Sequence, residues 1–144
     1  DVRALTENNL IGTILVCQTF IPPMVRSGGG SVINIGSVAA HVGCSNGAIY
    51  ATLKAAVVHY TRCLATELKE AGVRVNAVAP GMTRTEMTDG MFGNPNLERA
   101  VLEEIPLGRM GTSEDIAHAA VYLADPRCFM TGETLSVDGG LAAI

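Results

Sequence analysis

Residues 31–54 have the sequence SVINIGSVAAHVGCSNGAIYATLK, in which an apolar run is followed by a loop and then by a helical pattern. The run SVINI at 31–35 indicates a short buried strand, because its residues are mostly apolar rather than alternating with polar ones. Glycine and serine residues mark a loop at 36–47, and helical periodicity runs from Ala48 to about Ala71. The stretch therefore predicts a strand–loop–helix unit of an α/β fold.

The alternation of helices and strands continues on both sides of this unit. We predict further helices at 2–21, 97–104 and from Ser113 to about Leu123, and further strands at 73–79 and 134–137. Pro22-Pro23 is expected to kink or end the first helix. Ser113 and Asp115 can both cap the last helix, and Ser113 is the better N-cap candidate. This order of elements predicts an α/β layer with parallel strands.

Three strands are few for such a layer. Each predicted strand is apolar enough to be buried on both faces, and parallel strands of that kind normally lie in larger sheets. The strand at 31–35 would also leave an unpaired apolar edge, which favours aggregation. The chain begins with Asp1 rather than Met. We therefore expect N-terminal strands to be absent and residues 1–144 to form a single partial domain.

The composition argues against several classes of function. Of the 144 residues, 48% are hydrophobic and 17% are charged, below the roughly 25% charged residues usual in soluble domains. The net charge is −4, and no run of Lys and Arg offers a surface for nucleic acid or an anionic membrane. The uncharged stretch 8–25 is interrupted by Gln18 and Pro22-Pro23, which favours a buried helix over a membrane span. No signal peptide is visible, so we expect a cytoplasmic protein.

The cysteines and histidines do not form a recognisable metal or disulfide pattern. No pair among Cys17, Cys44, Cys63 and Cys128 has the CxxC spacing, and the three histidines show no HExxH spacing. Reduced thiols in the core or in loops are therefore expected, and no metal site is predicted.

The sharpest chemical signal is Tyr50-Ala51-Thr52-Leu53-Lys54 at the start of the second long helix. Residues four apart share one face of a helix, so the Tyr50 hydroxyl and the Lys54 ammonium can converge. A free phenol titrates at about pH 10, and a nearby positive charge lowers such a pKa by stabilising the phenolate. The pair is a candidate acid/base for moving a proton on or off an oxygen, although the same spacing also occurs on ordinary solvated helix faces.

Two further polar residues lie where they can serve this chemistry. Ser37 follows the strand at 31–35, and α/β sheets place their sites beyond the carboxyl ends of their strands. Its hydroxyl can donate to a carbonyl oxygen or accept from an alcohol, and the alternative is an ordinary turn residue. Asn9 interrupts an apolar helix, so its amide is expected to hold a water or a main-chain carbonyl, or to be a satisfied core side chain.

Together these features resemble the short-chain dehydrogenase/reductase family over essentially all of the chain. The matching motifs follow the family's order and spacing: Asn9-Leu10-x-Gly12, the strand with Ser37, Tyr50-x-x-x-Lys54, Asn76-Ala77-Val78-Ala79-Pro80-Gly81, and Gly132-Glu133-Thr134-Leu135-x-Val137-Asp138-Gly139-Gly140. Five ordered motifs are far more specific than any one of them. The resemblance implies a Rossmann-like, doubly wound parallel sheet, of which this chain supplies the C-terminal part with about three strands.

The resemblance also implies an NAD(P)-dependent oxidoreductase that interconverts a secondary alcohol and a ketone. Tyr50 would be the general acid/base, and Lys54 would lower the pKa of that phenol and bind the nicotinamide ribose. Ser37 would orient the substrate oxygen, and Asn9 would anchor a water that links Lys54 to solvent. The segment that would hold the nicotinamide carboxamide contains Pro80, Gly81, Thr83 and Thr85. Within the family, we favour a 3-oxoacyl-thioester reductase because this is the commonest role in the branch.

Two parts of the family pattern are missing from the sequence. Neither the Gly-rich TGxxxGxG turn, which meets the cofactor pyrophosphate, nor the NNAG-like strand end is present. Gly28-Gly29-Gly30 is no substitute, because it follows a helix and precedes a strand. We therefore predict the catalytic half of an enzyme, with the choice between NAD and NADP left open. The alternative is a non-catalytic truncated fragment, or a binding subunit that pairs with an intact relative.

The expected partners are a small alcohol or ketone and further copies of the chain, with no nucleic acid and no membrane. The resemblance implies a homo-tetramer or homo-dimer formed by the helices at 2–21 and 48–71. The loop after Pro80 contains an apolar set that suits either an apolar substrate or packing onto the core, namely Met82, Met87, Met91, Phe92 and Leu97.

Overall fold

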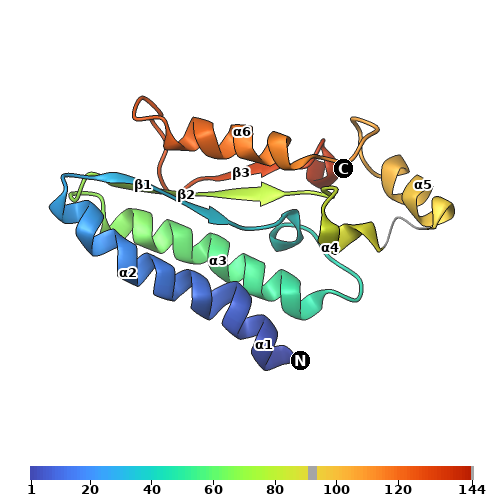
Figure 1. The fold of residues 1–144 in the computed structure, drawn as a ribbon, viewed down its shortest axis with the longest axis horizontal. Helices are drawn as coiled ribbons and strands as arrows, with labels where there is room; N and C mark the ends of the chain where they lie inside the picture. Colours follow the sequence, from blue (N-terminus) through green and yellow to red (C-terminus); the bar gives the residue numbers. More distant parts are fainter. Residues whose placement is uncertain (91–93, 144) are drawn as a thin grey trace.

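A three-stranded parallel sheet lies at the centre of the computed structural model, which describes residues 1–90 and 94–143 (Figure 1). The strands lie side by side in the order β1, β2, β3, with bounds Gly30–Ile35, Val73–Pro80 and Thr134–Val137. Gly30 pairs with Val73, and Ala77 pairs with Thr134, at the starts of the two ladders. The predicted α/β layer with parallel strands is confirmed, and each strand lies within one residue of its expected position.

Helices cover both faces of this sheet (Figure 1). α2, Gly12–Arg26, and α3, Ala48–Glu67, lie on one face, and α6, Ser113–Ala124, lies on the other. Two hydrophobic clusters result. One buries Cys17, Ile21, Leu64, Ala65, Val73 and Val75, and the other buries Val78, Leu123 and Cys128.

The three strands differ in how far they are buried. β2 is paired on both sides and buried along nearly all of its length. β1 and β3 are each paired with one neighbour among the described residues and are mostly half-buried. The expectation that all three strands are buried on both faces was therefore wrong for the outer two. The expectation that β1 forms an edge is confirmed for the described part of the chain.

The first helix is longer than predicted and changes its winding. α1, Val2–Thr6, passes through a π-helical turn at Glu7–Ile11 into α2, which ends only at Arg26. The expected end at residue 21 was wrong, because Pro22-Pro23 lies inside the helix. A proline removes one main-chain hydrogen bond. Here the residues four positions earlier, 18 and 19, are exposed, so water can satisfy their carbonyl groups.

Short helices follow β2 around the carboxyl ends of the strands. These are α4, Glu86–Asp89, and α5, Pro95–Glu103. The N-cap of α6 is Thr112 rather than the predicted Ser113, because Thr112 and Asp115 form a reciprocal capping box. No helix in residues 1–90 and 94–143 is long and apolar enough to cross a membrane.

Candidate active site

Tyr50 and Lys54 lie on one face of α3, in its first two turns. The Lys54 ammonium nitrogen lies 5.7 Å from the centre of the Tyr50 ring, within the range of a cation–π contact. The same nitrogen donates a hydrogen bond of 3.0 Å to the carbonyl of Ile35, the last residue of β1. Burial lowers the pKa of Lys54 below its ordinary value of 10.5. The structure thus brings the predicted pair together and ties it to the carboxyl end of a strand.

Ser37 lies two residues beyond that strand end and is buried. Its backbone is extended, and its hydroxyl oxygen accepts a hydrogen bond of 3.2 Å from the amide of Ala39. Ser37 thereby caps a 3₁₀ turn at Val38–Ala40, which packs against α3. Because this bond uses a lone pair, the hydroxyl proton can still be donated to another oxygen.

Asn9 lies in the π-helical turn, a local irregularity that is common at functional sites. The side-chain amide of Asn9 donates to the main-chain carbonyl of Leu5 at 3.1 Å. The main-chain carbonyl of Asn9 accepts from the Thr13 hydroxyl at 3.2 Å. The amide therefore holds a main-chain carbonyl, one of the expected arrangements. Asn9 and Lys54 line one pocket of about 270 Å³ beside the free edge of β1.

The segment Gly81–Thr85, which we call the cofactor segment, forms a turn directly after β2. The Gly81 amide donates to the carbonyl of Val137, the last residue of β3, at 3.0 Å. A β-carbon on Gly81 would lie 2.6 Å from the β-carbon of Asp138 and 2.7 Å from its α-carbon, so only glycine fits there. The Thr83 hydroxyl donates to the carbonyl of Gly81 at 3.2 Å, and Thr85 caps α4. Contact of Pro80, Gly81, Thr83 and Thr85 with a cofactor stays a prediction.

The family model described as enoyl-(acyl carrier protein) reductase matches residues 1–142 of the chain. This chain belongs to the short-chain dehydrogenase/reductase family. Among curated relatives, 3-oxoacyl-(acyl-carrier-protein) reductase of Chlamydia pneumoniae is 39% identical over 142 residues, which cover 98% of this chain and 56% of the relative. The human protein of the same description is 37% identical over 144 residues, or 100% of this chain and 58% of the relative.

Solved structures of the family superpose closely on this chain. Gluconate 5-dehydrogenase from Burkholderia cenocepacia, in complex with NADP and tartrate, has a TM-score of 0.96 at 32% identity, covering 100% of this chain and 57% of that one. A 7α-hydroxysteroid dehydrogenase complexed with NADH and 7-oxo glycochenodeoxycholic acid has a TM-score of 0.92 at 35% identity, with coverages of 97% and 55%. The expected Rossmann-like fold is confirmed, and the chain spans a little over half the length of these relatives.

A buried polar cluster in this family member escaped prediction from the sequence. The side-chain amide of Asn34, in β1, donates to the Thr61 hydroxyl of α3 at 2.9 Å, and the Cys17 thiol of α2 donates to the Asn34 carbonyl oxygen at 3.6 Å. Burial raises the pKa of Cys17, which keeps the thiol a neutral donor. A single Asn inside the apolar run SVINI was the available signal. The cluster joins α2, β1 and α3 close to Lys54 and Ile35.

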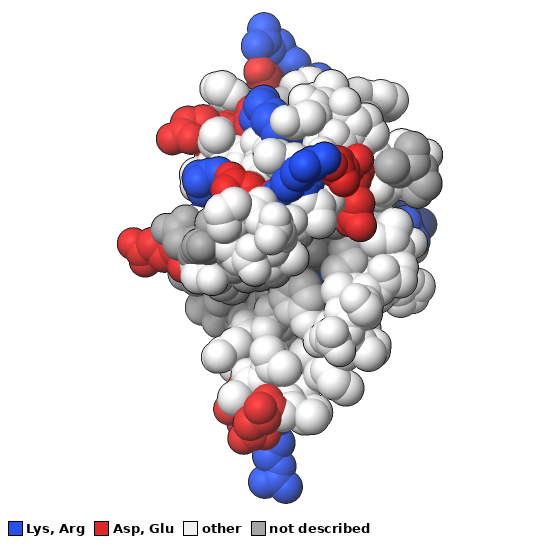
Figure 2. Space-filling model, turned by 90° about the vertical axis from the view of Figure 1, so that its right-hand side faces the viewer, with Lys and Arg blue, Asp and Glu red and all other residues white. Residues whose placement is uncertain are grey.

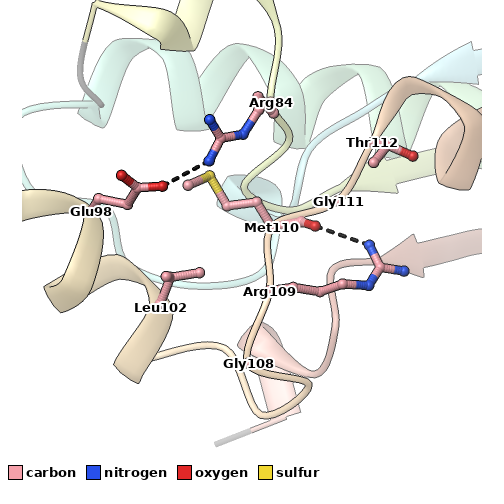
Figure 3. A pocket seen from close by; sticks show the side chains of 8 residues that line it. All are labelled: Arg84, Glu98, Leu102, Gly108, Arg109, Met110, Gly111 and Thr112. Carbon is pink, nitrogen blue, oxygen red and sulfur yellow. Dashed lines mark hydrogen bonds and ion pairs between the residues drawn. The ribbon is translucent and has the colours of Figure 1, made fainter. Parts of the chain in front are cut away.

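A second missed feature of this short-chain dehydrogenase/reductase is a cavity of about 260 Å³ between α5 and the loop before α6 (Figure 3). Arg84 and Glu98 form an ion pair of 2.7 Å at its rim. The full lining is Arg84, Glu98, Leu102, Gly108, Arg109, Met110, Gly111 and Thr112. Except for Arg84, these residues come from segments that carry none of the family motifs, so no sequence signal marked them.

The other residues singled out in the sequence lie in varied settings. Met82 is half-buried and Leu97 is exposed. Met91, Phe92 and the side chain of Met87 lie outside the described residues. Within the described chain, no group of three or more His, Cys, Asp or Glu side chains is placed to hold a metal ion.

Proposed function

We propose that the protein carrying this chain is an NAD(P)-dependent oxidoreductase that interconverts a secondary alcohol and a ketone, with Tyr50 as general acid/base. One observation carries the proposal: the Lys54 ammonium lies between the Tyr50 ring and the Ile35 carbonyl, at the strand end that leads into Ser37. Family membership and the NADP and NADH named for the solved relatives support it.

The described residues fit the nicotinamide half of such a cofactor. An ammonium group has three donors, and Lys54 uses one on the Ile35 carbonyl, which leaves two for ribose hydroxyls. When bound, the nicotinamide would supply or accept the hydride. Its carboxamide would be held by the cofactor segment.

The side chains of this chain would then manage the proton. In the direction of reduction, Tyr50 donates its phenolic proton to the oxygen of the substrate carbonyl as that oxygen gains negative charge. In the direction of oxidation, it removes the proton from the alcohol. Ser37 donates its hydroxyl proton to the same substrate oxygen and so fixes its position. Asn9 and Lys54 border one pocket, which supports a water-mediated proton path from Lys54 to solvent.

Replacing the phenol alone tests the proposal. In the full-length protein we expect Tyr50→Phe to remove turnover, a loss on the order of a hundredfold or more, while NAD(P) binding stays close to that of the wild type. Tyr122→Phe is the matched control, because Tyr122 is exposed on α6, on the other face of the sheet. Turnover by Tyr50→Phe at the rate of the control would reject the assignment.

Within this class we propose a 3-oxoacyl thioester as the substrate. Support comes from the two curated relatives described as 3-oxoacyl-(acyl-carrier-protein) reductases, although the solved relatives are named for gluconate and a hydroxysteroid. Figure 2 looks onto the carboxyl ends of the strands and shows charged side chains in its upper part and at its lower tip, with fewer charged side chains between them. The kcat/KM for reduction of a short 3-oxoacyl thioester by NAD(P)H should exceed the kcat/KM for oxidation of gluconate by NAD(P)+, and the opposite ranking would reject this substrate.

The free edge of β1 favours one alternative, a binding subunit or fragment that pairs with an intact relative. The 144-residue chain would then function without turning over a cofactor by itself. We expect the isolated chain to bind NAD(P) poorly, because the motifs that meet the pyrophosphate and the adenosine are absent from it. Micromolar binding of NAD(P) to the isolated chain by calorimetry would show that this half suffices.

We also propose a homo-tetramer or homo-dimer in a reducing, cytoplasmic compartment. α2 exposes Leu15 and Phe20, each more than half exposed, which supports burial against another copy. The four cysteines are free, as reduced thiols would be. Sedimentation of the full-length protein as a monomer would reject the oligomer.

A further inference from the structure

The loop Gly108–Thr112 lies directly against the cofactor segment. The amide of Gly111 donates to the carbonyl of Met82 at 2.9 Å, and the amide of Arg84 donates to the carbonyl of Gly111 at 3.0 Å. The two bonds form a parallel bridge between Thr83 and Gly111. A β-carbon on Gly111 would lie 3.3 Å from the Thr83 hydroxyl oxygen, so the two segments are in close contact.

The ion pair between Arg109 and Asp115 makes hydrogen bonds to the residues directly before and after Gly111. Arg109 donates to the two carboxylate oxygens of Asp115 at 2.7 and 3.1 Å. It also donates to the carbonyl of Met110 at 3.0 Å, the bond drawn in Figure 3. Asp115 also accepts from the Thr112 amide at 2.8 Å and from its hydroxyl at 3.2 Å. The residues directly before and after Gly111 are therefore both tied to the pair Arg109–Asp115.

The setting of this pair indicates that it fixes a position more than it adds stability. Its side chains are 58% and 30% exposed, and exposed ion pairs contribute little to the free energy of unfolding. A bidentate Arg–carboxylate contact, however, defines the direction of both groups. The pair thus sets the path of Met110, Gly111 and Thr112 behind the cofactor segment.

We infer that Arg109 and Asp115 are positioning residues for the cofactor segment, acting through Gly111 on Thr83. The inference rests on the proposed function, because it assumes that the cofactor segment holds the nicotinamide. Loss of the pair loosens that segment and leaves Tyr50 and Lys54 in place, since these are held by α3 and β1. NAD(P) binding is therefore weakened more than the proton transfer is slowed.

The chain contains a matched control at the other end of α6. Arg127 donates to both carboxylate oxygens of Asp125 at 3.0 and 2.7 Å, with side chains 91% and 32% exposed. This second pair has the same chemistry, and its carboxylate is exposed to a similar extent, 32% against 30%. The side-chain hydrogen bonds between Asp125 and Arg127 stay within the turn that follows α6, and the Asp125 carbonyl accepts from Arg74 of β2 rather than from the cofactor segment.

The experiment compares Arg109→Gln with Arg127→Gln in the full-length protein. We expect Arg109→Gln to raise the KM for NAD(P) roughly tenfold with kcat changed less than about twofold, and Arg109→Lys, which keeps one contact, to give a smaller rise. In the protein without cofactor, hydrogen exchange at the Arg84 amide should quicken in Arg109→Gln and stay unchanged in Arg127→Gln. The melting temperatures of the two Gln variants should agree within a few degrees.

Each outcome decides the inference. Equal KM values and equal Arg84 exchange in the two Gln variants would overturn it, while wild-type turnover would leave the proposed function standing. A wild type that neither binds nor turns over NAD(P) would overturn both. If Arg109→Gln fails to fold, Gly111→Ala decides instead, because the added β-carbon would lie 3.3 Å from the Thr83 hydroxyl oxygen and disturb the same contact between the two segments. An unchanged KM in folded Gly111→Ala would then reject the inference.

Discussion

The proposed chemistry depends on two regions that are held together by different means. The catalytic region, Ser37 with Tyr50 and Lys54, is fixed by one helix and one strand end, which the hydrogen bond of 3.0 Å from Lys54 to the Ile35 carbonyl joins beside the site. The clasp region, the cofactor segment together with residues 108–115, is fixed by the backbone hydrogen bonds of Gly111 to Met82 and Arg84, which bridge Thr83 and Gly111, 28 positions apart in the chain. In the first region, helical periodicity places Tyr50 and Lys54 on one face. In the second, an ion pair fixes the path of a loop. Changes in the two regions should therefore have different effects, on turnover in one and on cofactor binding in the other.

The largest effect is expected from Lys54→Met in the catalytic region. Removing the ammonium breaks the contact with the Ile35 carbonyl and leaves Tyr50 without its charged neighbour, so turnover in the full-length protein should fall on the order of a hundredfold or more. Lys69→Met is the control, since Lys69 is exposed and lies 3.8 Å from Glu70 alone. Steady-state kinetics of both variants measure the difference. A loss confined to KM for NAD(P), with kcat intact, would move Lys54 from the catalytic region to cofactor binding.

The catalytic region could be predicted from the sequence because its geometry is local. Tyr50 and Lys54 are one helical turn apart, and Ser37 follows a strand whose apolar run is plain in the sequence. The clasp region could not be predicted in the same way. Arg109 and Asp115 lie on either side of a turn, and only the folded chain shows that Gly111 bonds to Met82 and Arg84. The N-cap of α6 was misplaced by one residue for the same reason, because Asp115 selects Thr112 through its side chain.

The outer strands and the first helix show a second limit of sequence reasoning. Apolar strands were expected to be buried on both faces, yet β1 is half-buried because burial depends on neighbours that the described chain does not contain. Pro22-Pro23 was expected to kink or end the helix, yet α2 continues to Arg26 because the carbonyl groups that lose partners face solvent. In both cases the local residue preference was read correctly, and the surroundings decided the outcome.

The next largest effect is expected from Gly81→Ala, at the start of the cofactor segment. The new methyl group would overlap the α- and β-carbons of Asp138, the residue directly after β3. We expect the free energy of unfolding to fall by about 3 kcal/mol, together with weaker NAD(P) binding. Gly43→Ala is the control, because nothing lies within 4 Å of its β-carbon. Chemical denaturation of both variants tests this, and equal stability would mean that the turn after β2 is adaptable.

A smaller effect is expected from Thr61→Val, which removes the buried link between α3 and β1. The side-chain amide of Asn34 would lose its partner, and a buried unsatisfied donor costs about 1–2 kcal/mol of the free energy of unfolding. Thr66→Val is the matched control: its hydroxyl also bonds the carbonyl four residues back, but on the exposed side of α3. If the control loses as much stability as Thr61→Val, the intrahelical bond rather than the link to Asn34 is responsible.

The smallest effect is the pH dependence of stability, which compares the pair Arg109–Asp115 of the clasp region with the pair Arg127–Asp125. Arg109, and then the Thr112 amide, hold the pKa of Asp115 well below its ordinary value of 3.8. Arg127 likewise lowers the pKa of Asp125. Between the folded and unfolded pKa values the unfolded chain binds more protons, so the contribution of each pair is complete above about pH 5 and is lost as the pH falls below about 4.

Denaturant unfolding between pH 6 and pH 3 should show that Asp115→Asn and Asp125→Asn each flatten the acid loss of stability, Asp115→Asn by more, because its carboxylate has the more strongly lowered pKa. At pH 6, however, only Asp115→Asn should speed hydrogen exchange at the Arg84 amide, because only that carboxylate is connected through Thr112 and Gly111 to the cofactor segment. Faster exchange at the Arg84 amide in Asp115→Asn alone would establish that the two pairs differ in what they position. Equal exchange in the two variants would mean that the clasp stabilises the fold and positions nothing.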